Sequence, residues 1–136
     1  MLEYNFRMKM EELYLEEKRL QEEARKTIYQ KLRDILNEFF QKTIKELGRN
    51  SFIKKCEKIS VCKEVSGEEF VNIAYNKAKK EMTESEKFTV EQLHTLEGIN
   101  ELNEYLRKEY AGSVSCKMNP EKEDVLIFEL ELNINP

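Results

Sequence analysis

The hydrophobic pattern of this chain begins with a period of two. Apolar side chains occupy every second position from Leu2 to Met10. Such a period places them on one face of an extended chain, so we predict a strand over 2–10. The alternative is that these residues form the frayed start of the helix that follows.

A long helix is predicted next, because the chain has no Gly or Pro from Glu11 to Leu47 and Gly48 follows where a helix would end. Its apolar face is broad over 28–47, which is typical of burial in a core. Over 10–26 the apolar stripe is thin and meets at most one partner helix. We therefore predict that 10–26 projects as an arm, or pairs with a second copy, through the apolar a and d heptad positions Met10, Leu13, Leu20 and Ala24.

The middle of the chain is less regular. Residues 51–65 are predicted to form a helical turn and then a short strand. Ser66 with Glu69 has the spacing of a capping box, which predicts a helix running to about Met82. Thr89 with Gln92 repeats that spacing before a further helical pattern, which Gly98 either interrupts or divides into two helices.

The C-terminal region returns to a period of two. Val114 and Cys116 precede turn residues at 119–124, and apolar side chains then alternate from Val125 to Ile134, which predicts a β-hairpin. The fold class is thus a helix-rich α+β domain spanning 1–136. If Gly98 divides the helix, residues 67–134 resemble a winged-helix domain in the order of their elements.

Net charge argues against the use that this resemblance implies. The chain carries −4 overall, but 83–136 contain 12 acidic and 5 basic residues. Duplex DNA binding relies on Lys and Arg that face phosphates, so this region is unsuited to it. A basic cluster elsewhere, formed by Lys77, Lys79 and Lys80, is the candidate nucleic-acid-binding site, although such clusters are more often solvated helix faces.

Groups that could carry out catalysis are sparse. His94 is the single histidine, and the chain has no G-x-S-x-G turn or Gly-rich phosphate loop. Cys56, Cys62 and Cys116 lack zinc-ribbon spacing and are typical of reduced thiols. No apolar run is long enough to cross a membrane. We expect a cytoplasmic, non-enzymatic protein that uses no metal or cofactor.

These observations favour a protein–protein interaction module, such as a small adaptor, inhibitor or assembly component, that is homodimeric through its arm. Lys in excess over Arg, much Asn and Ile, and few Ala indicate an AT-rich genome, which fits an accessory protein of a bacterium or phage. The alternative function is a winged-helix-like nucleic-acid-binding regulator.

Overall fold

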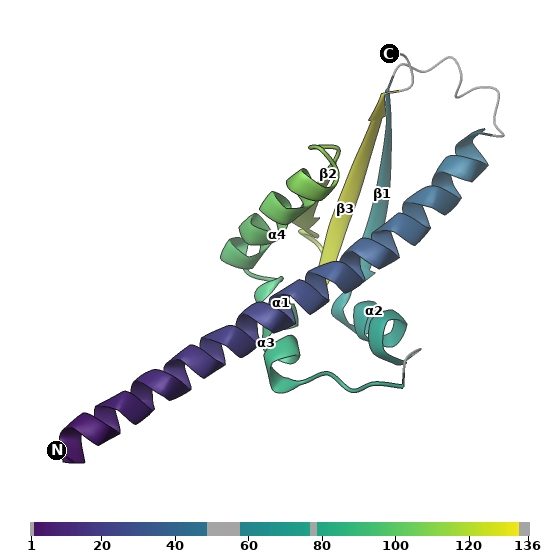
Figure 1. Ribbon diagram of the computed structural model, residues 1–136. Coiled ribbons are helices and arrows are strands. Elements are labelled where there is room, and N and C mark those ends of the chain that lie inside the picture. The colour runs from purple at the N-terminus through teal and green to yellow at the C-terminus, as the bar shows by residue number, and fades with distance from the viewer. Residues whose placement is uncertain (1, 49–57, 77–78, 134–136) are drawn as a thin grey trace.

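The computed structural model describes residues 2–48, 58–76 and 79–133, and these form a helix-rich α+β fold (Figure 1). One helix runs across the whole molecule, and three antiparallel strands and the shorter helices lie along its C-terminal part. The elements in chain order are α1 (Leu2–Gly48), β1 (Lys58–Ser66), α2 (Gly67–Val71), the π-helix η2 (Asn72–Asn76), α3 (Glu84–Gln92), α4 (Leu96–Glu109), β2 (Val114–Met118) and β3 (Val125–Asn133).

Helix α1 begins at Leu2, so the predicted strand over 2–10 is wrong. Leu, Met, Glu, Lys and Arg are good helix formers, and a helix that is already nucleated gains one backbone hydrogen bond for each residue added. A strand would need a neighbouring strand to satisfy its backbone. The long helix predicted over 11–47 is confirmed, and it begins earlier than predicted, at Leu2.

The hydrophobic core lies between the second half of α1, the sheet and α4. Leu36, Leu102 and Phe128 are fully buried at its centre and come from these three parts of the fold. The broad apolar face predicted over 28–47 is therefore confirmed as a core face. It ends at Phe40, since Ile44 is exposed.

The sheet has the order β1-β3-β2, with β3 in the middle and antiparallel to both neighbours. The predicted hairpin is confirmed as β2 and β3, although Ile134 lies outside the described residues. The predicted strand before residue 66 is β1, whose Val65 pairs with Leu126. The helical turn predicted at the start of 51–65 falls largely in 49–57, outside the described residues.

The helix predicted from Ser66 to about Met82 starts as expected but ends early. The Ser66 hydroxyl oxygen accepts a hydrogen bond from the backbone N–H of Glu69 at 2.9 Å. The α-helix covers only five residues and continues as the π-helix η2 to Asn76. Met82 lies in the non-helical segment before α3 and packs against the core.

The next two helix starts differ from the prediction. Thr83 caps α3 in a complete capping box with Glu86, and Thr95 caps α4. Thr89 begins no helix: it lies inside α3, where its hydroxyl donates to the carbonyl oxygen of Ser85 at 2.9 Å. Gly98 does not divide the helix either, because it occupies the first turn of α4. The break lies at residues 93–95, and α3, turn, α4, β2 and β3 keep the order of elements on which the winged-helix resemblance rests.

Candidate interaction surfaces

The N-terminal part of α1 extends beyond the body of the protein (Figure 1). We call residues 2–20 the arm, because every one of them is exposed. The predicted interface residues Met10, Leu13 and Leu20 are 57%, 61% and 42% exposed. Ala24, the fourth, is instead buried in the chain's own fold at 5% exposure, so its assignment to a partner interface is corrected. Ala24 marks the place where the arm enters the body.

The arm carries more apolar surface than the heptad stripe indicated. Phe6 and Tyr14 lie on the same side as Met10 and Leu13, since residues three and four apart share a helix face. A second stripe lies on the opposite side of the helix. Its members are Tyr4, Met8 and Leu15, each between 45% and 67% exposed. The strand predicted over 2–10 separated Tyr4 and Met8 from the helical pattern, and Leu15 lies outside that range. A helical period applied from Leu2 onward places all three on one side.

The arm is nearly neutral in charge. Residues 2–20 contain four basic and five acidic side chains, and both signs occur along its length. One exposed ion pair, Arg19 with Glu23 at 2.8 Å, links its end to the following turn. An arm with this balance has no basic face suited to a phosphate backbone, whereas it offers both charges to a protein partner.

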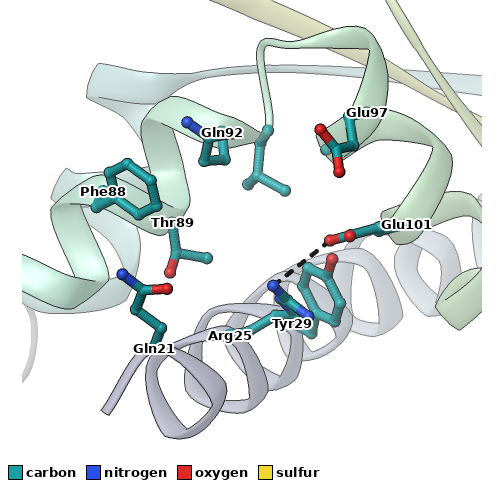
Figure 2. Close-up of a pocket in the computed structure, with 10 residues that line it drawn as sticks. Gln21, Arg25, Tyr29, Phe88, Thr89, Gln92, Glu97 and Glu101 are labelled. Carbon is teal, nitrogen blue, oxygen red and sulfur yellow. Dashed lines mark ion pairs between the residues drawn. The ribbon is translucent and has the colours of Figure 1, made fainter. Parts of the chain in front are cut away.

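At the base of the arm, α1 meets α3 and α4 around a small pocket of about 110 Å³ (Figure 2). Arg25 of α1 pairs with Glu101 of α4 at 3.6 Å across it. The Tyr29 ring lies beside them and packs on Tyr105 with ring centroids 4.9 Å apart. Burial raises the pKa of Tyr29 to about 12. The pocket is well below the roughly 300–1,000 Å³ of small-molecule sites, so we interpret it as the joint that fixes the arm to the body.

A larger open hollow of about 690 Å³ lies between α2, η2, α3 and the start of β3. His94 and Asp124 line it, and His94 Nε2 lies 2.8 Å from Asp124 Oδ1. The carbonyl oxygen of Asp124 also accepts a hydrogen bond from the Gly67 N–H at 3.0 Å. His94, in the turn after α3, therefore links that turn to the residue that precedes β3. The described residues that line the hollow include no serine or cysteine to serve as a nucleophile.

The C-terminal part of the fold, from α3 to β3, carries more acidic than basic side chains. In α4 the exposed charged side chains are four acidic and two basic ones, Glu97, Glu101, Glu104 and Glu109 against Arg107 and Lys108. The turn between β2 and β3, which the winged-helix resemblance would make the wing, has residues 121–124 exposed, with three acidic side chains and one basic one. Of the candidate nucleic-acid-binding lysines, Lys79 and Lys80 are exposed beyond η2. Lys77 lies outside the described residues.

The remaining candidate chemistry is limited in the part of the chain that the structure describes. Within it, no three His, Cys, Asp or Glu side chains are grouped so that they could hold a metal ion. Cys62 is exposed and Cys116 is buried, whereas Cys56 falls in the segment that is not described. Among the described helices, none combines the length and apolar character needed to cross a membrane.

Comparison with protein-family models, with curated proteins and with solved structures finds no match to this chain. The function therefore has to be inferred from the surfaces of the chain itself. Among the described residues, the arm carries nine of the thirteen large hydrophobic side chains that are exposed. Surfaces of that kind typically mark interaction sites in soluble proteins.

Proposed function

We propose that this protein is a non-enzymatic protein–protein interaction module that self-associates through its arm. The observation that supports it is the exposure of apolar side chains along an unsupported helix, with Leu13 at 61% and Phe6 at 69%. An isolated helix of this length is only marginally stable in water, and most helical stability in proteins comes from packing of an apolar face. A second copy covers that face without requiring any other component.

The joint at the base of the arm supports the same proposal. The Arg25–Glu101 ion pair and the Tyr29–Tyr105 ring contact connect α1 to α4 immediately after the arm. An arm held in a fixed direction loses less conformational entropy on binding than a flexible tail. In this proposal the body acts as the platform, and its acidic α4 and wing remain available to further components of an assembly.

The test measures the mass of the protein by light scattering. Leu13→Glu with Leu20→Glu places charges in the heptad stripe and should reduce the mass to one chain of 16.3 kDa. The matched control is Glu12→Gln with Lys18→Gln, which changes exposed polar residues off the stripe and should leave the mass of the assembly unchanged. A mass that is the same for the double Glu variant and the unaltered chain would remove the arm from the proposal.

A nucleic-acid-binding regulator is the second candidate, favoured by the helix, turn, helix and hairpin order of α3 to β3. The acidic surface of α4 opposes it, since phosphate neutralisation supplies most non-specific affinity. Fluorescence titration of labelled duplex DNA at about 50 mM salt tests it. Binding that weakens with salt and with Lys79→Glu plus Lys80→Glu would favour the regulator, whereas absence of binding would exclude it.

A further inference from the structure

The heptad stripe of the arm contains two charged residues at a positions, Glu3 at its start and Glu17 toward its body end. With Met10 at an a position, the d positions are Phe6, Leu13 and Leu20, and all three are apolar. The next a position is Glu17, which lies in the same stripe. A partner helix that covers Leu13 and Leu20 must also approach the Glu17 carboxylate. The need for a favourable neighbour beside this charge therefore limits the orientation and register in which two arms can pair.

A parallel pair handles this carboxylate badly. In a parallel coiled coil each a residue faces the same a residue of the other chain, so Glu17 would lie against Glu17 of the second copy. Like charges facing each other in a desolvated seam are destabilising. In an antiparallel pair each a residue lies opposite a d residue. Glu17 then faces an apolar d residue of the second copy in place of a second carboxylate.

The body of the protein limits the antiparallel register. Ala24 is buried, and α3 contributes Thr89 and Gln92 to the joint around Gln21 and Arg25. A second helix on the stripe must therefore end before Ala24. With Met10 opposite Leu13 of the second copy, Glu3 of that copy lies opposite Leu20, short of Ala24.

The neighbouring registers fit worse. A shift of one heptad toward the body would place Phe6 of the second copy on buried Ala24. A shift of one heptad away would leave Leu20 uncovered and would bring Lys9, a g residue, next to Lys9 of the second copy. Only the register between them covers the exposed stripe without meeting the body.

In that register the charges are complementary. Lys9 lies beside Glu16 of the second copy, since both are g residues that flank the seam on the same side. Glu17 lies at nearly the same height as Arg7 of the second copy, an e residue on the same side of the seam. Two-fold symmetry produces each pair twice.

We propose that residues 2–20 of two copies pair as an antiparallel two-helix coiled coil whose symmetry axis passes between Glu11 and Glu12. This inference rests on the proposed self-association and adds its orientation and register. The two bodies then lie at opposite ends of the paired arms, with their α4 and wing surfaces far apart. The second stripe, Tyr4, Met8 and Leu15, faces away from the pair.

Cysteine cross-linking tests the orientation. Met10→Cys and Leu13→Cys are made separately in a chain that also carries Cys56→Ser and Cys62→Ser, which leaves only buried Cys116 of the native thiols. On mild oxidation, the mixture of the two variants should form disulfide-linked dimers, because a and d side chains meet across the antiparallel seam. Each variant alone should remain mainly uncross-linked.

Other outcomes of this experiment would distinguish a failure of the antiparallel orientation from a failure of the proposed self-association. Rapid cross-linking of Met10→Cys alone, with a dimeric mass before oxidation, would indicate a parallel pair and overturn the orientation while self-association stands. A mass of four chains before oxidation would overturn the two-chain arrangement. A mass of one chain, with no cross-links in any mixture, would overturn both proposals.

Discussion

Glu86 shows how a single buried residue decides where a helix begins. Its carboxylate is 5% exposed and accepts hydrogen bonds from the Tyr75 hydroxyl and, at 3.4 Å, from the backbone N–H of Thr83. Thr83 and Thr89 both precede a Glu or Gln by three residues, so their sequence patterns are equivalent. In the structure, the hydrogen bond from Tyr75, eleven residues upstream of Glu86, distinguishes the helix start at Thr83 from the one predicted at Thr89. The capping-box spacing is local and cannot show such a distant partner.

The first prediction concerns this partner. Tyr75→Phe removes the hydroxyl and leaves the buried carboxylate of Glu86 with one fewer donor. A buried polar group that loses its partner costs about 1–3 kcal/mol, so the free energy of unfolding should fall by that amount in urea titrations. Tyr14→Phe, which makes the same change on the exposed arm, is the control. Its free energy of unfolding should stay within about 0.5 kcal/mol of that of the unaltered protein. Equal effects of the two changes would contradict the buried hydrogen bond.

The second prediction concerns alkaline pH. Burial raises the pKa of Cys116 from 9.0 to about 12, and burial likewise raises the pKa values of Tyr29 and Tyr110 to about 12. Each group is protonated in the fold at pH values where it loses its proton in the unfolded chain. The stability it contributes is therefore complete below its unfolded pKa and is lost as pH rises toward its folded pKa.

The urea midpoint should accordingly decline from about pH 9, where Cys116 titrates in the unfolded chain, and more steeply above about pH 10, where the tyrosines join it. In Cys116→Ala the decline should begin only near pH 10. A midpoint that stays constant to about pH 11 in the unaltered protein would contradict the burial of these groups.

At the scale of elements, Gly98 has a packing role in place of the predicted helix break. A Cβ at this position would lie 1.7 Å from the carbonyl oxygen of Gln92, the last residue of α3. The absence of a side chain is what allows the first turn of α4 to approach the end of α3 so closely. The sequence identified the residue as special, but only the structure shows which backbone atom approaches it.

The third prediction follows from this contact. Gly98→Ala should destabilise the protein by about 1–3 kcal/mol or more, because the turn at 93–95 has to move to remove the overlap. Gly48→Ala is the matched control, since a Cβ at Gly48 has no heavy atom within 4 Å. Thermal unfolding of the two variants measures the difference. A Gly98→Ala protein as stable as Gly48→Ala would contradict the close approach of α3 and α4.

The arm explains why its own secondary structure was predicted wrongly. Alternating apolar residues from Leu2 to Met10 fit one face of a strand, yet in a helix they divide between two opposite faces. Phe6 and Met10 belong to one stripe, and Tyr4 and Met8 to the other. A helix that is apolar on two sides is unusual in a monomer, and its pattern is difficult to distinguish from that of a strand by periodicity alone.

At the scale of the whole molecule, the sequence indicates which segments are buried but not how distant segments meet. The core half of α1 and the β2–β3 hairpin follow from strong local patterns, and both are confirmed. The pairing of β1 with β3 joins Val65 to Leu126, about sixty residues apart, and no local signal specifies it. The same holds for the joint of Arg25 with Glu101 at the base of the arm.

The fourth prediction uses the charges of the arm to control assembly. In the antiparallel register, Lys9→Glu alone places two acidic residues side by side at both symmetric positions, and Glu16→Lys alone places two basic ones there. Surface pairs of this kind contribute about 0.2–1 kcal/mol each, so two reversed pairs should weaken each self-association by about tenfold. Lys9 and Glu16 are seven residues apart, too far to pair with each other within one helix.

Mixing the two variants should restore association, because in a mixed pair the glutamate introduced at position 9 lies beside the lysine introduced at position 16. The unaltered Glu16 and Lys9 of the two chains form the second pair. Sedimentation of the separate and mixed proteins measures this, and moderate salt should reduce the difference between them. A parallel pair would respond differently, since Lys9 would then face Tyr14 and the mixture would gain nothing over its components. Recovery confined to the mixture therefore requires both self-association and the antiparallel register, and no property of the body alone can produce it.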